Sequence, residues 1–241
     1  MICAIHQPNF FPWLGYFRKI ARADIFVFLD AVPFPRTSRG TWVNRVKLLV
    51  SGKSQWVTCP IRRDQKDPRI LSVQIDETQA WRKKLLRSLE MSYGRAPCFA
   101  KCMPWIAPMI ERPLAGLADY NVSNVKELAE RLGLQCRFVR QSEMQGREVF
   151  EKKGSERLAT ICQEVGATTY LAGDGASEYE DLSNYERAGI RLIRNEFQAL
   201  TYPQASASGH VAGLSILDAL LNVGDGKTAG LLASPDYNSR P

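Results

Sequence analysis

The chain has 241 residues, of which 45% are hydrophobic and 24% charged, the composition of an ordinary soluble globular protein. No apolar run approaches the roughly 18–20 residues that a membrane span needs, so no membrane span is predicted. The net charge of +7 favours an anionic partner.

The N-terminus leads directly into an apolar segment, without the basic region and long apolar core of a signal peptide. The six cysteines are scattered, and Cys98 and Cys102 lack the second pair or nearby histidine that would complete a zinc site. We therefore expect reduced thiols, no metal centre and a cytoplasmic protein.

The first elements alternate strand, helix, strand. Ile2–Ile5 predicts a buried strand, Leu14–Arg22 a helix and Ile25–Leu29 a strand buried on both faces. Between the first two lies a stiff connection, because Pro8 and Pro12 fix φ and cannot donate backbone hydrogen bonds. Such a connection after a first strand is a common place for α/β proteins to keep their chemistry.

The middle of the chain is less regular. Residues 43–50 are ambiguous, whereas Gln55–Cys59 and Ile70–Ile75 predict strands of a smaller antiparallel piece. A helix is expected from Thr78, as its cap, to Met91. The four prolines of residues 96–118 predict broken helical segments rather than one helix.

In the second half, the order helix, glycine, strand recurs at Gly133, Gly166 and Gly189, the rhythm of βα units on a parallel sheet. The predicted helices are Asn121–Leu132, capped by Asn121 or Ser123, then Ser155–Val165, Leu182–Ala188 and Leu214–Leu221; the strands are Cys136–Val139, Thr168–Ala172 and Ile190–Ile193.

These elements predict an α/β, Rossmann-like fold with a mostly parallel sheet and helices on both faces. We expect a single domain over residues 1–224, with a smaller inserted piece at about residues 51–118. Residues 225–241 are small and polar and predict a flexible C-terminal tail.

The first candidate site is the connection after the first strand. His6 and Asp30 follow neighbouring predicted strands, and a carboxylate on one imidazole nitrogen would orient the ring as a general base. Gln7 lies beside His6, and Trp13 and Tyr16 would form an aromatic wall for a base or a sugar. A structural histidine and a turn-capping aspartate are the alternative interpretation.

Basic residues follow Asp30. Arg36, Arg45 and Lys47 would contact the phosphates of a nucleotide, for which the forked guanidinium of arginine is suited. A nucleic acid would use a longer basic stripe, and both possibilities stay open.

Two further segments complete the candidate residues. Gly173, Asp174 and Tyr179 belong to an acidic glycine turn, a poor phosphate cradle that better suits the hydroxyls or amino group of a sugar. Tyr202, Gln204 and His210 lie in a loop of small residues that we expect to act as a lid. A triad of His210 with Ser215 and Asp218 is conceivable, but no nucleophile elbow surrounds the serine.

Four blocks of this sequence together resemble the WbqC-like family over about residues 1–224. They are HQPNFFPWLGYFRKI at residues 6–20, WVNRVK at 42–47 (which includes Asn44), YLAGDGA at 170–176 with Tyr179, and LSILDALLNVG at 214–224. The resemblance implies a protein of bacterial surface-polysaccharide clusters that adds an acyl or aminoacyl group, such as glycyl, to an amino sugar. The chain departs from the family pattern at residues 209–213, where an aromatic residue usually precedes the last block.

We therefore predict a transferase that acts on the amine of a nucleotide-linked amino sugar, with His6 as base and Asp30 as its orienter. Aminoacyl-tRNA and acyl-CoA are candidate donors, no cofactor is identified, and ATP is the candidate if the donor is a free acid. One alternative is an ATP-dependent ligase or nucleotidylyltransferase, because the opening resembles the H-x-G-H layout with Tyr16 near its second histidine. The other alternative is a noncatalytic module that binds RNA or a nucleotide.

Overall fold

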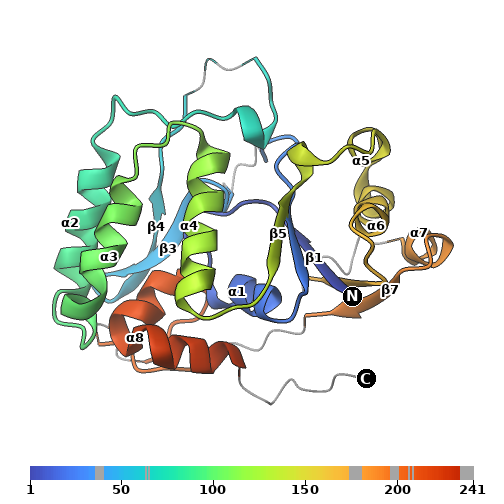
Figure 1. The fold of residues 1–241 in the computed structure, drawn as a ribbon. Helices are drawn as coiled ribbons and strands as arrows, with labels where there is room; N and C mark the ends of the chain where they lie inside the picture. The colour runs from blue at the N-terminus through green and yellow to red at the C-terminus, as the bar shows by residue number, and fades with distance from the viewer. Residues whose placement is uncertain are drawn as a thin grey trace.

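A computed structural model describes residues 1–35, 41–62, 64, 66–173, 181–195, 201–205, 207 and 209–233. At its centre is a five-stranded sheet in the order β5-β2-β1-β6-β7 in which every pairing is parallel (Figure 1). The strands are β1 Ile2–His6, β2 Ile25–Phe28, β5 Arg137–Arg140, β6 Thr169–Ala172 and β7 Arg191–Arg194. The predicted parallel sheet is therefore confirmed.

The strand order reverses beside β1. From β1 the chain adds β2 and β5 on one side, and then returns to add β6 and β7 on the other. In open α/β sheets, ligands bind outside the carboxyl ends of the strands at such a reversal. Here those ends are His6 of β1 and Ala172 of β6.

Helices cover both faces of the sheet, as predicted. Alternate strand residues such as Ala4 and Phe26 pack in a core with α1, α4 and α8, whereas Cys3 and Ile25 pack in a second core with α5, α6 and α7. The bounds are α1 Leu14–Ala21, α4 Leu117–Arg131 and α8 Ile216–Ala233 for the first set, and α5 Glu148–Glu151, α6 Gly154–Glu164 and α7 Leu182–Arg187 for the second.

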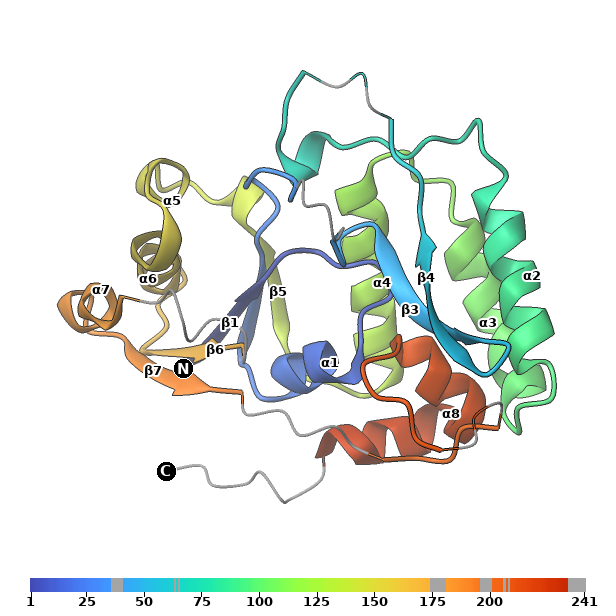
Figure 2. The ribbon, with the colours of Figure 1, turned by 180° about the vertical axis from the view of Figure 1, so that it is seen from behind.

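The chain between β2 and α4 forms a hairpin and two helices beside the sheet (Figures 1 and 2). The elements are β3 Arg45–Val50, β4 Lys53–Thr58, the 3₁₀ turn η1 Ile70–Ser72, α2 Trp81–Tyr93 and α3 Phe99–Glu111. The partner of the predicted Gln55–Cys59 strand is the ambiguous segment 43–50, not Ile70–Ile75. The Ser51-Gly52 turn, with φ of 50° and 73°, closes a tight hairpin and explains this pairing.

The prediction of broken helical segments over residues 96–118 is wrong for α3, which continues through Pro104 and Pro108. Both prolines are exposed, while Cys102, Ile106 and Met109 are buried at helical spacing. Packing of this apolar face, chiefly against α8, therefore outweighs the backbone hydrogen bonds that the prolines remove.

Two predicted helix caps are also wrong. Helix α2 begins at Trp81 rather than at Thr78, whose backbone N–H instead binds Asp76 Oδ1. Helix α4 begins one turn earlier than predicted, so Asn121 lies inside it, where its buried amide donates to the Pro8 and Val43 carbonyls. Asn121, a residue type that often caps helices, therefore makes a tertiary contact here instead of capping α4.

Residues 225–233, expected in the flexible tail, are helical. Helix α8 changes direction at Gly224, whose φ of 79° permits the break, and Thr228 Oγ1 donates to the Gly224 carbonyl to begin the second part. Residues 234–241 lie outside the described part. No helix within the described residues is long and apolar enough to cross a membrane.

Candidate functional site

The loop between β1 and α1 is fastened to two distant parts of the chain. Asn121 Nδ2 on α4 donates to the Pro8 carbonyl at 3.0 Å, and Ser215 Oγ donates to the Phe11 carbonyl at 2.7 Å. Phe11 has φ of 39°, which a residue other than glycine rarely adopts, and these contacts hold it there. The loop thus presents its side chains from a rigid platform.

His6 ends β1 and lies half-buried against Tyr16 and Trp13, with ring centroids at 4.8 and 5.9 Å. Burial lowers the pKa of His6 to about 3, helped by the charge of Lys19 and partly offset by the Gln7 carbonyl. Nδ1 lies 3.1 Å from that carbonyl, which can only accept a hydrogen bond. The proton of the neutral ring is therefore on Nδ1, and Nε2 carries the lone pair.

The hydroxyl of Tyr16 donates to the same Gln7 carbonyl at 3.1 Å. Burial raises the pKa of Tyr16, so it is a neutral donor at ordinary pH. Tyr16 therefore fixes the strand end beside His6, in addition to forming the predicted aromatic wall with Trp13.

Asp30 does not join His6. Its fully buried carboxylate accepts from Arg140 Nε at 2.7 Å and from the Ser142 N–H and hydroxyl at 2.9 and 2.7 Å. Among the described residues no hydrogen bond links it to His6. Strand β2 lies between β1 and β5, and the Asp30 side chain bonds on the β5 side although Leu29 N still donates to the His6 carbonyl, which the sequence alone does not reveal.

Lys19 connects two of the predicted segments and was not identified from the sequence. It is 3% exposed, its Nζ donates to the Ile5 carbonyl at 2.8 Å, and it lies 5.6 Å from the ring centroid of Tyr170. The same Nζ is 3.9 Å from where a Cβ of Gly173 would be. The signal for Lys19 is its place in a helix buried nearly all round, because such a helix seldom carries a cation without reason.

A ladder of aromatic rings leads from His6 to the hairpin. Trp13 and Trp42 have centroids 4.7 Å apart, and Trp42 and Trp56 are 4.9 Å apart. Above Trp56 lie the Arg45 guanidinium at 4.0 Å and the Lys47 ammonium at 5.1 Å. Trp42 and Trp56 were missed, although Trp56 is exposed on a strand, which is itself a signal of binding.

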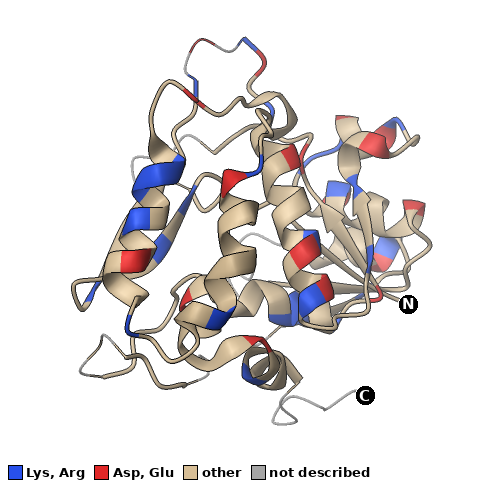
Figure 3. Ribbon diagram, turned by 60° about the vertical axis from the view of Figure 1, so that its left-hand side comes forward, with Lys and Arg blue, Asp and Glu red and all other residues tan. Residues whose placement is uncertain are grey.

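We call Trp13, Trp42, Trp56, Arg45 and Lys47 the cationic aromatic surface. Arg45 and Lys47 form no ion pair and no side-chain hydrogen bond within the described part of the chain, and the buried Nε of Arg45 has no partner. Basic residues are spread over the molecule, with a dense run on α2 (Figure 3). Arg82 on α2 is also half-buried over a ring, that of Trp81, but it pairs with Glu77, whereas the two hairpin cations have no acidic partner among the described residues.

Asn44 lies just before β3 but faces a different environment. Its Nδ2 donates to the Cys59 carbonyl at 3.0 Å, and the residue lines a pocket of about 1180 Å³ beside the end of β4. Asn44 thus adjoins both the cationic aromatic surface and this pocket.

Tyr202 and Gln204 both donate hydrogen bonds to one buried carboxylate, that of Asp218. Tyr202 Oη and Gln204 Nε2 donate to Asp218 Oδ2 at 2.6 and 2.9 Å, and Gln204 also bonds the backbone N–H and carbonyl of Val211. Burial raises the pKa of Asp218 despite these bonds. Tyr202, Gln204 and Val211 are therefore bonded to one another or to Asp218, while His210 is exposed, with its ring centroid 5.3 Å from that of Tyr202. The lid stays a prediction.

Ser215 does not form the conceivable triad. It is fully buried, donates to the Phe11 carbonyl and accepts from Leu217 N at 3.2 Å, so it caps the start of α8. Arg36, Asp174 and Tyr179 lie outside the described residues. The cysteines of the described part are free thiols, and that part contains no cluster of three or more side chains able to hold a metal.

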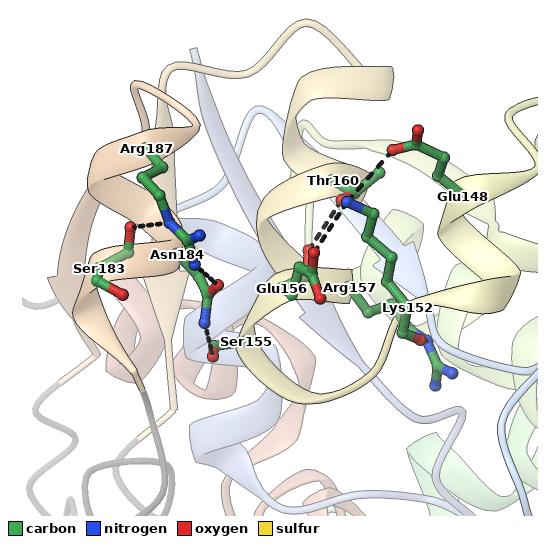
Figure 4. A network of polar contacts seen from close by, with 9 residues as sticks. All are labelled: Glu148, Lys152, Ser155, Glu156, Arg157, Thr160, Ser183, Asn184 and Arg187. Atoms are coloured by element: carbon green, nitrogen blue, oxygen red, sulfur yellow. Dashed lines mark hydrogen bonds and ion pairs between the residues drawn. The ribbon is translucent and has the colours of Figure 1, made fainter.

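A polar cluster on α5, α6 and α7 provides a contrast (Figure 4). Lys152 pairs with Glu148 and Glu156, and Arg187 donates to Asn184 Oδ1 at 2.6 Å. The adjoining hollow measures only about 190 Å³. These cations are satisfied within the protein, so the cluster stabilises the helices and does not indicate a ligand site.

Comparison with known proteins agrees with the resemblance noted from the sequence. Residues 7–229 match the WbqC-like protein family. A protein of Mycobacterium tuberculosis (strain ATCC 25618 / H37Rv), named "Uncharacterized protein Rv1507c", is 31% identical over 236 residues, which cover 97% of this chain and 96% of that protein. No solved structure matches the chain significantly. The chain belongs to the WbqC-like protein family.

Proposed function

We propose that the protein is a transferase of bacterial surface-polysaccharide or related glycan biosynthesis, which adds an acyl or aminoacyl group to the amine of a nucleotide-linked amino sugar. One observation carries the proposal: Arg45 and Lys47 lie half-buried over Trp56 and have no acidic partner among the residues that the structure describes. Two fixed cations beside an aromatic face suit a diphosphate joined to a base. The resemblance to the family supplies the expectation of an amino sugar.

In this proposal Arg45 and Lys47 bind the diphosphate, and Trp42 and Trp56 stack against the base or sugar. His6 Nε2 accepts the amine proton as the nitrogen bonds to the acyl carbon. The bond from that carbon to the donor's leaving atom breaks, and the proton passes to that atom. The low pKa of His6 keeps Nε2 unprotonated throughout the neutral range and also makes it a weak base, so it accepts the proton only as the amine nitrogen turns acidic on bonding to the acyl carbon.

The test is a mass-spectrometric assay with nucleotide-linked amino sugars and three donors: acyl-CoA, aminoacyl-tRNA, and a free acid with ATP. We expect one acylated product, and we expect His6→Ala to lower turnover by about 10²–10⁴-fold with the fold intact. No product with any pair, or full turnover by folded His6→Ala, would contradict the assignment.

The cationic aromatic surface also favours a second candidate, a module that binds single-stranded nucleic acid. Such proteins combine aromatic stacking platforms with basic grooves, and their affinity falls steeply with salt. Binding of a short single-stranded RNA with that salt dependence, without turnover of any sugar, would select this candidate.

A further inference from the structure

One pocket among the described residues, the one that Asn44 lines, lies where β4 leaves the hairpin. Its walls are the end of β4 with the following turn, and residues 74–79. The backbones of these walls are joined, since Arg62 N donates to the Gln74 carbonyl at 3.0 Å and Asp76 N to the Pro60 carbonyl at 2.9 Å. Ile75 N is further bonded to the Ala115 carbonyl at 2.8 Å. The pocket is therefore framed by fastened backbone.

The size and lining define the ligand chemistry. The volume of about 1180 Å³ exceeds the roughly 300–1,000 Å³ of pockets that bind drug-sized ligands. The described lining combines amide and hydroxyl side chains with apolar ones, which matches the hydroxyl groups and C–H faces of sugar rings. The amides and hydroxyls are Asn44, Thr58, Gln74, Thr78 and Gln79, and the apolar residues include Pro60, Ile61 and Ile75.

The charges of the pocket oppose an acidic ligand. Among the described lining residues are three carboxylates and one guanidinium, a net charge of −2 for that part of the lining. The guanidinium of Arg62 is bound by Asp64 at 2.6 Å, so it is poorly available to a phosphate. The carboxylate of Asp76 accepts from Thr78 and Gln79, which retains it as a hydrogen-bond acceptor of fixed position.

The pocket adjoins the cationic aromatic surface. Thr58 lines the pocket and pairs across the hairpin with Arg45, while Trp56 pairs with Lys47. Residues opposite one another, and those two positions along a strand, share one face of a hairpin. Thr58, Arg45, Trp56 and Lys47 therefore form one continuous face that leads into the pocket.

We propose that this pocket is a saccharide subsite, which binds uncharged or amine-bearing sugar rings and rejects acidic sugars. This deepens the proposed function and rests on it only in joining the sugar to a nucleotide held by Arg45 and Lys47. The two hairpin cations face the anionic end of such a ligand, and the carboxylate-lined pocket faces its hydroxyl-bearing end.

The test uses saturation-transfer NMR of the full chain with three disaccharides: cellobiose, the dimer of glucosamine, and digalacturonate. We expect binding of the first two and at least tenfold weaker binding of the acid. Ala115→Trp, at an exposed lining position, should weaken binding of the first two by at least tenfold. Ala100→Trp, exposed on α3 away from the pocket, is the matched control.

No binding of either non-acidic disaccharide, equal binding of the acid, or equal effects of the two tryptophan variants would overturn the subsite. Titration of nucleoside diphosphates separates this result from the proposed function. Nucleotide binding without disaccharide binding would remove the subsite alone. Disaccharide binding lost in Ala115→Trp, without nucleotide binding, would retain the subsite and remove the nucleotide-linked substrate.

Discussion

Two arginines in this protein have opposite surroundings. Arg140, at the end of β5, binds the carboxylates of Asp30 and Asp119 at 2.7 and 2.6 Å. Arg45, at the start of β3, is also half-buried, yet it lies over the ring of Trp56 with no acidic partner among the described residues. The Asp30 region was predicted to be catalytic and is saturated with internal bonds, whereas the Arg45 region leaves its charges open.

The difference teaches how to separate structural charges from functional ones. Partial burial of a cation costs free energy, and an internal carboxylate offsets that cost, as it does for Arg140. A cation retained without such an offset indicates that its partner arrives from outside the chain. The same reasoning assigns the Lys152 and Arg187 cluster to stability (Figure 4).

The largest loss of stability should come from a substitution of Asp30, whose buried carboxylate is fully hydrogen-bonded within the protein. Asp30→Ala leaves Arg140 and Ser142 without their buried partner, so the free energy of unfolding should fall by about 3–5 kcal/mol. Asp119→Ala, which removes the exposed partner, should cost less than about 1 kcal/mol. Urea unfolding measures both. Similar small losses in the two variants, or loss of turnover by a stable Asp30→Ala protein, would break the comparison.

A second prediction concerns how the free energy of unfolding depends on pH, because the pKa of His6 is lowered in the folded protein. Its pKa is lowered to about 3, so between pH 6.5 and 3 the unfolded chain binds a proton that the folded protein does not. The contribution is complete above pH 6.5 and is lost as pH falls, by about 2.5 kcal/mol between pH 7.5 and 4.5. His6→Gln lacks this term. We therefore expect the wild type to lose that much relative to the variant in urea unfolding; an unchanged gap would mean that the imidazole titrates normally.

The smallest effect concerns Asp218, a buried carboxylate whose Oδ2 accepts hydrogen bonds and whose Oδ1 has no partner among the described residues. Burial raises its pKa, so its contribution to stability is lost as pH rises through that folded value. Asp218→Asn keeps the acceptor for Tyr202 and Gln204 without the charge, and should gain up to about 1 kcal/mol relative to the wild type at pH 8.

Asp218→Ala removes the acceptor and should lose about 1–3 kcal/mol. Unfolding at pH 5 and 8 compares the three proteins. If Asp218→Asn is as unstable as Asp218→Ala at both pH values, the carboxylate charge itself is required and the interpretation fails.

The sequence predicted the parallel sheet because its strands are short apolar runs separated by helices and glycines, a local pattern. It failed at α3 because the exposure of Pro104 and Pro108 depends on packing against α8. It also gave Ile70–Ile75 as a strand and left residues 43–50 ambiguous, whereas β3 comes from the ambiguous segment and its pairing with β4 depends on the turn at Ser51-Gly52.

The roles of the candidate residues stay predictions, but their placement can be compared with the structure. His6, Trp13, Tyr16, Arg45 and Lys47 lie along one ladder of rings, of which only the wall of Trp13 and Tyr16 was expected from the sequence. The pairing of His6 with Asp30 failed because strand order decides toward which neighbour a loop turns. Lys19 and the large pocket depend on contacts between distant segments, which no local pattern contains.

The central claim is that Arg45 and Lys47 hold the phosphates of a ligand, and isothermal titration with UDP, GDP and dTDP tests it most directly. Arg45→Ala and Lys47→Ala should each weaken the best-bound nucleotide by about 1.5–3 kcal/mol, the scale of a hydrogen bond to a charged group. Lys53→Ala, exposed on β4, is the control and should change little. Equal affinities of all four proteins, or no nucleotide binding by the wild type, would contradict the account.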